Sequence, residues 1–113
     1  MEEIGQLSLD IIQTQDSIII LAPIAGTATR DVTVTVTDDV LTIKGERLPP
    51  YEVEEKDFLT KECFWGKFSR SIVLPKNCNP REIVANSKNN ILEIKIPRLT
   101  TDKSKVVKIN EEK

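Results

Sequence analysis

A run of six consecutive β-branched residues constrains the fold of this chain more than any other feature. From Val32 to Thr37, valine and threonine alternate strictly, so the valines face one side of an extended strand and the threonines face the other. Such side chains fit a pleated strand better than a helix. Asp38-Asp39 then has the composition of a tight turn, and residues 40–44 are again rich in β-branched and apolar residues. The segment 32–44 therefore predicts a β-hairpin.

Shorter extended segments occur on both sides of this hairpin. Further strands are expected over residues 7–11, 18–21, 64–74, 82–86 and 92–96. The segment 18–21 is apolar at every position, which is typical of an interior strand. Asn89-Asn90 is a candidate for a type I′ turn, because asparagine tolerates positive φ. No long segment has the i, i+3, i+4 spacing of a helix, and the chain is predicted to be an all-β antiparallel sandwich.

The connection between residues 46 and 62 is long for a small β domain. It begins with Pro49-Pro50, which blocks regular structure. Connections of this length are usually functional or disordered, and apolar side chains argue against plain disorder. The apolar residues are Tyr51, Val53, Phe58 and Leu59. Two interpretations remain open: an arm that pairs with a neighbouring sheet, or an excursion folded back on its own domain.

Beyond Pro97 the chain is polar except for an isolated apolar set at 106, 107 and 109. Side chains two apart on an extended chain project to the same side. Val107-x-Ile109 could therefore lie in a groove and add to a sheet edge. Residues 97–107 span up to ~35 Å when extended, enough to reach another subunit. The alternative is that 106–109 form the last strand of the same sandwich.

Composition excludes several classes of function. The 113 residues allow one domain, and they include no histidine, which removes histidine-dependent nucleophiles and metal motifs. Two cysteines cannot complete a four-thiolate zinc site. They are interpreted as reduced thiols in a cytoplasmic protein, with a Cys63–Cys78 bridge as the alternative. A net charge of −2 and 4% aromatic residues provide no basic or stacking surface for nucleic acid.

Membrane and enzyme classes are also disfavoured. No apolar run approaches the ~20 residues that cross a bilayer. The paired carboxylates Asp38-Asp39 and Glu54-Glu55 would point to opposite faces of a strand, so neither pair converges on one substrate atom. The four glycines are scattered and form no phosphate-binding loop. We therefore expect a protein that is not an enzyme and uses no metal or cofactor.

Three ordered motifs carry a resemblance to a known family. Residues 66–75 resemble G-x-F-x-R-x-x-x-L-P, residues 85–92 resemble A-x-x-x-N-G-V-L with Asn90 at the glycine position, and residues 40–47 resemble V-L-x-I-x-G-E-R. These motifs are similar to those of the small heat-shock proteins of bacterial or archaeal type, the α-crystallin domain family. The resemblance covers residues 7–97 and implies an immunoglobulin-like β-sandwich. Residues 1–6 would then be a short N-terminal segment and 98–113 a C-terminal extension.

The resemblance implies an ATP-independent molecular chaperone, a holdase that binds partly unfolded proteins and limits their aggregation. In bacterial, archaeal and plant members, a strand inside the long loop is exchanged between two subunits. Tyr51, Val53 and Phe58 are therefore expected at a homodimer interface. Arg70 matches the arginine of the family motif, is expected near that interface, and would need a carboxylate partner. The candidate partners are Glu46, Glu52, Glu54, Glu55 and Asp57.

The family also carries a C-terminal I-x-I/V motif that docks in a groove of another subunit. Val107 and Ile109 resemble that motif and would build assemblies larger than the dimer. The expected groove residues are Val32, Val34, Val36, Ile83 and Ala85. In the free state such a groove is an exposed apolar edge, and therefore also a client site.

One departure from the family concerns the N-terminus. Family members carry a long apolar arm before the sandwich, whereas here the first strand is expected near Leu7. The chain is therefore interpreted as either a naturally short member or a trimmed domain.

The rival interpretation is a CS-type co-chaperone domain, a protein-binding module without holdase activity that shares the sandwich. Such domains lack the motifs at 66–75 and 85–92 and the strand in the loop. The sequence therefore favours the chaperone.

Overall fold

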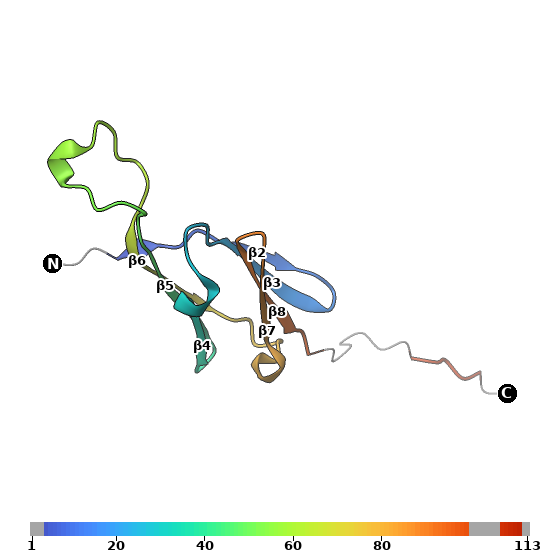
Figure 1. Ribbon diagram of the computed structural model, residues 1–113. Coiled ribbons are helices and arrows are strands. Elements are labelled where there is room, and N and C mark those ends of the chain that lie inside the picture. The colour runs from blue at the N-terminus through green and yellow to red at the C-terminus, as the bar shows by residue number, and fades with distance from the viewer. Residues whose placement is uncertain (1–3, 100–106, 112–113) are drawn as a thin grey trace.

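The computed structural model describes residues 4–99 and 107–111, which form a sandwich of two four-stranded sheets (Figure 1). Sheet A contains, in spatial order, β1 (Gly5–Gln6), β6 (Gly66–Val73), β5 (Val40–Arg47) and β4 (Thr33–Thr37). Sheet B contains β2 (Asp10–Gln13), β3 (Ser17–Pro23), β8 (Ile91–Pro97) and β7 (Val84–Lys88). Short 3-10 turns lie in three connections: η1 (Thr29–Asp31), η2 (Glu55–Asp57) and η3 (Pro80–Glu82). Among the described residues, no helix has the length and apolarity to span a membrane.

Both predicted two-residue turns are confirmed. Asp38 and Asp39 have φ values of 49° and 65° between β4 and β5, and Asn89 and Asn90 have 54° and 63° between β7 and β8. Positive φ at both central residues is what a type I′ turn requires. Asparagine at position 90 therefore replaces the family's glycine without loss of the turn.

The core lies between the inner faces of the two sheets. On sheet B, β3 and β8 run antiparallel so that Ile18 pairs with Ile96 and Ile20 with Ile94, all of them fully buried. On sheet A, Leu41 and Ile43 of β5 close the core from the other side. Full burial of one such side chain stabilises the fold by about 1.5–3 kcal/mol. Alternate burial along these strands confirms the predicted sandwich.

The N-terminal segment corrects the sequence-based expectation of one strand over 7–11. The structure divides it between the two sheets: β1 pairs in parallel with β6, and β2 pairs with β3. Leu7 lies at the crossover, is buried in the core, and donates its amide hydrogen to the carbonyl of Ser69 (N···O 3.3 Å). A two-residue period does not reveal which sheet each residue joins. The sandwich therefore begins at Gly5, two residues before the expected position.

A second difference concerns the segment expected as a strand over 82–86. The turn η3 occupies Pro80–Glu82, and its first amide is capped by the Asn79 side chain, which accepts from Arg81 N at 3.2 Å. The strand β7 therefore begins only at Val84 and continues to Lys88, where it meets the Asn89-Asn90 turn. The Asn79-Pro80 sequence shifted the strand by two residues, because proline at the start of a 3-10 turn favours that turn.

Two of the three sequence motifs meet in one contact. Gly45 of β5 lies directly opposite Phe68 of β6, and a Cβ atom at position 45 would lie 2.4 Å from the Phe68 ring. The Arg47 guanidinium lies 5.6 Å from the centroid of the same ring, and its Nε donates to the Ala25 carbonyl at 2.7 Å. Glycine is therefore required at position 45 for space. Arg47 fixes the point at which β5 ends and the long connection leaves the sandwich.

The two cysteines are free, and the alternative of a Cys63–Cys78 bridge is not what the structure shows. Cys63 is exposed in the long connection, and Cys78 is buried. Burial raises the pKa of the Cys78 thiol, and the nearby Asp39 carboxylate raises it further. The Sγ of Cys78 lies 3.0 Å from the Pro75 carbonyl, to which it donates. Cys78 is therefore a protonated core residue at neutral pH.

The Gly45–Phe68 contact gives a testable prediction. Gly45→Ala should lower the free energy of unfolding by about 1–3 kcal/mol, because the added methyl group must displace a packed aromatic ring. Urea denaturation measures this change. In a Phe68→Leu background the same Gly45→Ala substitution should cost clearly less, because the clashing ring is gone. Equal costs in the two backgrounds would show that the ring does not lie over Gly45.

Candidate functional site

The surfaces that distinguish this molecule are the edges of its sheets. The strands β4 and β7 are edge strands on one side of the sandwich, and β1 and β2 are edge strands on the other (Figure 1). An edge strand presents a row of backbone N–H and C=O groups that can pair with another chain. All four residues of β2 are exposed, including Ile11 and Ile12. Edges of this kind can extend a sheet by binding an extended segment.

The predicted groove residues lie along β4 and β7 and at the residues that directly precede these strands. Val32, Val34 and Val36 are half-buried and pack against the core, and Ile83 packs against the same core. Ala85 is exposed on β7, where it pairs with Ile94 of β8. The structure thus brings the three valines and Ile83 to one side of the core and leaves Ala85 on the surface. The edges at β4 and β7 both have apolar side chains beside unpaired backbone groups. An extended apolar ligand could contact the side chains and pair with the backbone groups.

The C-terminal residues have no partner strand in the described part of the chain. The last strand, β8, ends at Pro97 as predicted, and residues 107–111 form no strand. Val107 is 73% exposed and Ile109 is 92% exposed. Residues 107–109 therefore do not form a last strand of their own sandwich, which was the alternative expectation. Val106 lies outside the described residues. Where the extension starts, Arg98 Nη1 donates to the Thr14 carbonyl at 2.8 Å, which fixes its point of departure.

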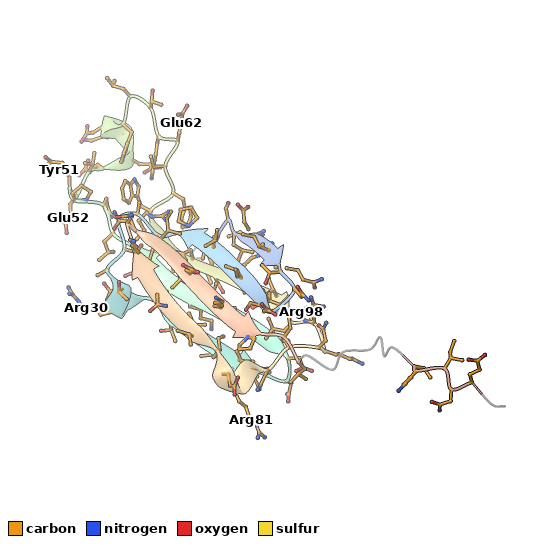
Figure 2. The ribbon with its side chains drawn as sticks, turned by 90° about the vertical axis from the view of Figure 1, so that its right-hand side faces the viewer. Arg30, Tyr51, Glu52, Glu62, Arg81 and Arg98 are labelled. Atoms are coloured by element: carbon orange, nitrogen blue, oxygen red, sulfur yellow. The ribbon has the colours of Figure 1, made fainter. Side chains whose placement is uncertain are left out.

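Residues 48–65, all of which are described, form a projecting connection that we call the arm. It extends away from the sandwich beyond the ends of β5 and β6 (Figure 1), and Figure 2 shows Tyr51, Glu52 and Glu62 far from the sheets. Its only regular element is the η2 turn. Tyr51, Val53 and Leu59 are exposed. The arm therefore does not fold back on its own domain, and the expected exchanged strand is not formed within a single chain.

Both lysines of the arm pair with glutamates of the arm. Lys56 lies 3.3 Å from Glu54, and Lys61 lies 2.7 Å from Glu55. The Lys61 ammonium also lies 4.9 Å from the centroid of the Phe58 ring, which is the half-buried member of the arm's apolar set. These contacts join neighbouring residues within the arm and do not connect it to the sheets. Exposed ion pairs of this kind stabilise weakly, so the arm can adopt another conformation at little cost.

Arg70 lies on β6 at the same face as Phe68 and Ile72, opposite Ile43. It is half-buried, and its Nη1 donates to the Leu7 carbonyl at 3.2 Å. Among the described residues it forms no salt bridge, so the expected carboxylate partner is not supplied by the same chain. Two of the candidates, Glu54 and Glu55, are paired within the arm instead. Arg70 therefore connects β6 to the N-terminal crossover and retains capacity for a further acceptor.

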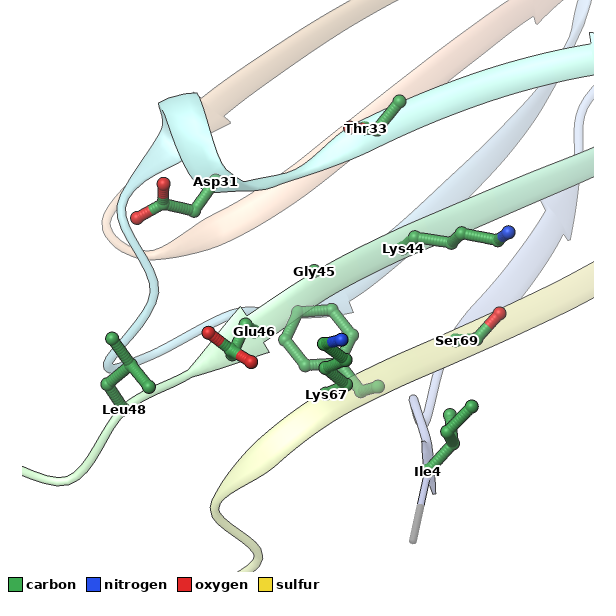
Figure 3. A pocket seen from close by; sticks show the side chains of 10 residues that line it. Ile4, Asp31, Thr33, Lys44, Gly45, Glu46, Leu48, Lys67 and Ser69 are labelled. Atoms are coloured by element: carbon green, nitrogen blue, oxygen red, sulfur yellow. The ribbon is translucent and has the colours of Figure 1, made fainter. Parts of the chain in front are cut away.

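Two hollows lie at the base of the arm, which sequence patterns did not reveal. The first, of about 640 Å³, lies over sheet A between Ile4 and Leu48 and has Lys44, Glu46 and Ser69 in its floor (Figure 3). The second, of about 500 Å³, is lined by Leu7, Pro23, Arg47 and Phe64, among others. Phe68 contributes to both. Both hollows therefore lie beside Phe68, and only the strand register reveals that Phe68 pairs with Gly45.

Metal chemistry finds no support in the described ranges: no three of their cysteine, aspartate and glutamate residues come together as a set that could hold a metal ion.

Comparison with known proteins identifies the family. Residues 10–110 match the Hsp20/alpha crystallin family. Over 101 residues the chain is 32% identical to small heat shock protein C4 of Rickettsia felis, covering 89% of this chain and 62% of that protein. It is 31% identical to small heat shock protein C2 of the same organism, covering 88% of this chain and 65% of that protein. The chain thus spans slightly less than two thirds of the length of these relatives.

Solved structures give the same result. The hspA protein of Xanthomonas axonopodis is 28% identical, with a TM-score of 0.75 over 82% of this chain and 93% of that chain. Heat shock protein 16.0 of Schizosaccharomyces pombe is also 28% identical, with a TM-score of 0.73 over 98% of this chain and all of that one. The sandwich, its motif contacts and these similarities show that the chain belongs to the Hsp20/alpha crystallin family, that of the small heat-shock proteins.

Proposed function

We propose that the protein is an ATP-independent chaperone that holds partly unfolded proteins and limits their aggregation. The observation that carries this proposal is the coincidence of free sheet edges with half-buried or exposed apolar side chains on β2 and β4. A partly unfolded client offers an extended backbone and apolar side chains, which are complementary to such an edge. Membership of the small heat-shock family supports the same function. No chemical step is needed, because capture depends on burial and backbone pairing alone.

The energetics favour many weak contacts. One buried valine or isoleucine contributes about 1.5–3 kcal/mol, and ordering a flexible segment offsets part of that gain. Tight capture therefore needs several edges acting together, which an assembly of copies supplies. Two free cysteines suit a reducing compartment, and we place the protein in the cytoplasm.

The dimer is proposed to form by exchange of the arm. In an extended arm, Tyr51 and Val53 project to one side, and pairing with the free edge of a second copy's β2 would give their backbone groups partners. On β2, Ile11 and Ile12 offer apolar contacts on both faces of that edge. Arg70 forms no salt bridge among the described residues, and it would donate to a carboxylate on the arm of the second copy. The arm forms no strand alone because an isolated extended segment has nothing to pair with.

Larger assemblies are proposed to form through the C-terminal extension. Val107 and Ile109 project to the same side of an extended segment, and both are exposed. The valines of β4 and Ile83 supply an apolar surface at the opposite edge from β2. Because this edge is separate from the edge proposed for the arm, the two contacts can form at the same time. A docked extension would also cover the client surface, so its release would expose that surface.

The holdase function predicts that heating a model client with this protein suppresses light scattering at sub-stoichiometric to equimolar ratios. The expected basis is burial of client segments along free edges. A stable β-sandwich protein of similar mass that is unrelated to chaperones is the control and should have no effect. Absence of suppression at every ratio would contradict the proposal and favour a module that binds one folded partner.

Exchange of the arm predicts that replacing residues 50–60 by a short glycine-serine linker yields a folded monomer. The sandwich should persist, because the arm makes its ion pairs internally. Sedimentation equilibrium measures the mass, and circular dichroism reports the fold. Lys56→Gln, which alters charge but keeps the apolar residues, is the matched control and should remain dimeric. A dimer that survives the replacement would show that the arm is not exchanged.

Docking of the extension predicts that Val107→Ala with Ile109→Ala leaves the dimer intact and removes larger species in native mass spectrometry. Lys108→Ala provides the control, since its side chain projects to the opposite side of an extended segment. That variant should assemble as the parent protein does. The docking role would be refuted by identical species distributions for the double variant and the parent.

A further inference from the structure

The outer face of sheet B carries an apolar strand, β3, where a solvated sheet face normally alternates with polar residues. Antiparallel sheets with one face in water alternate apolar and polar residues, yet β3 carries Ile19, Leu21 and Pro23 on its outer side as well as buried isoleucines on its inner side. Ile12 of β2 pairs with Ile19 and is 40% exposed, and Ile91 of β8 pairs with Pro23 and is 42% exposed. A strand that is apolar on both sides is typical of a strand covered on both sides.

The outer face of sheet A provides the contrast. There the residues of β4, β5 and β6 that lie opposite one another are mainly threonine, serine and lysine, including Thr35, Thr42 and Ser71 in one row. Thr42 and Ser71 share a hydrogen bond of 2.9 Å between their hydroxyl groups. The outer face of sheet A is therefore mainly polar, as a sheet face in contact with water normally is. The apolar character of the outer surface of the sandwich is therefore concentrated on sheet B.

The strand register arranges this face in two neighbouring rows. One row across β2, β3, β8 and β7 reads Ile12, Ile19, Lys95 and Val84. The next row reads Asp10, Leu21, Glu93 and Asn86. Lys95 and Glu93 therefore lie two residues apart on one strand, and neither has an oppositely charged residue directly across from it. Among the described residues neither forms a salt bridge.

We propose that the outer face of sheet B binds the same face of a second copy of this chain. A twofold axis that crosses the strands between the two rows places Lys95 opposite Glu93 of the second copy and Ile19 opposite Leu21 of the second copy. Symmetry repeats both contacts, so the centre of the patch on β3 and β8 is complementary to itself in charge and in apolar character. At its margins the same axis places Ile12 opposite Asp10 and Val84 opposite Asn86 of the second copy, so the contact depends on β3 and β8. The arm fits this face less well, because its acidic residues outnumber its lysines and would meet Glu93 and Asp10.

The size of the face sets the strength of the contact. Four strands ~4.8 Å apart and about five residues of ~3.3 Å along each give a footprint of roughly 300 Å². Stable complexes bury about 800 Å² per partner, so this contact is weak and reversible by itself. It uses neither the arm nor the extension, and it adds to assemblies that those segments hold together.

A charge-swap cycle tests the proposal in the full chain. Lys95→Glu and Glu93→Lys each place like charges across the twofold axis, whereas the double variant restores opposite charges. Sedimentation velocity over a range of concentrations at low salt measures self-association. We expect each single variant to weaken this face-to-face association at least ~10-fold, and the double variant to recover most of it. Circular dichroism and melting temperature should be unchanged, because both positions are exposed.

A second measurement separates this contact from those of the arm and the extension. Carbodiimide joins an amine to a carboxylate in direct contact, so mixed 14N- and 15N-labelled protein should give an intermolecular Lys95–Glu93 crosslink. The crosslink should persist in the Val107→Ala, Ile109→Ala protein and after replacement of residues 50–60. The proposal is overturned if no such crosslink forms at concentrations where copies associate, or if the double variant fails to recover. It is also overturned if the single variants change only client suppression, which would assign the face to clients.

Discussion

The unpaired backbone groups along the sheet edges determine how this molecule can associate with other chains. Among the described residues, the two four-stranded sheets have β1, β2, β4 and β7 as their edges. The edge strand β1 contributes only two residues, which pair with β6. Because a free edge beside apolar side chains promotes association, such a protein must cover its edges or use them. The arm and the extension are the parts of the chain that leave the sandwich with apolar residues exposed.

Covering an edge with a segment of another copy differs from covering it permanently. In the assembly that we propose, each contact would involve a few apolar side chains and would open readily, so that client segments would compete for the same surface. Weak contacts at separate edges would allow many subunits to associate while each remains exchangeable. The Gly45–Phe68–Arg47 contact supports this arrangement from inside the sandwich, because it fixes the direction in which the flexible arm departs.

Much of the fold was predictable from the sequence, for reasons that particular residues make clear. The alternation from Val32 to Thr37 and the paired aspartates and asparagines specify hairpins through local sterics alone. The crossover at Leu7 was not predictable, because a period of two does not identify the partner strand. The contact between Gly45 and Phe68 was not predictable for the same reason, since 22 residues lie between the two in the sequence and only the strand register brings them together.

The candidate site was predictable in its parts but not in its arrangement. Motif similarity selected the valines of β4, the arm residues and Val107 with Ile109, and the structure shows where each lies. The family resemblance gave Arg70 a carboxylate partner near the dimer interface, which stays a prediction, and the sequence did not reveal its hydrogen bond to the Leu7 carbonyl. The doubly apolar strand β3 was predicted to be interior, and it does lie between β2 and β8 in sheet B. Its outer residues Ile19 and Leu21 are half-buried in the single chain. The sequence of one chain does not reveal which partner would cover that outer side.

We propose that the sandwich leaves the edges at β2 and β4 free and that other copies of the chain cover them. Backbone hydrogen exchange of β2 and β4, followed by mass spectrometry at low and high protein concentration, tests this most directly. We expect rapid exchange at these strands in dilute protein and marked protection in concentrated protein, with β5 and β8 protected in both. Equal protection of β2 and β4 at the two concentrations, in a protein whose mass also stays that of one chain, would contradict it.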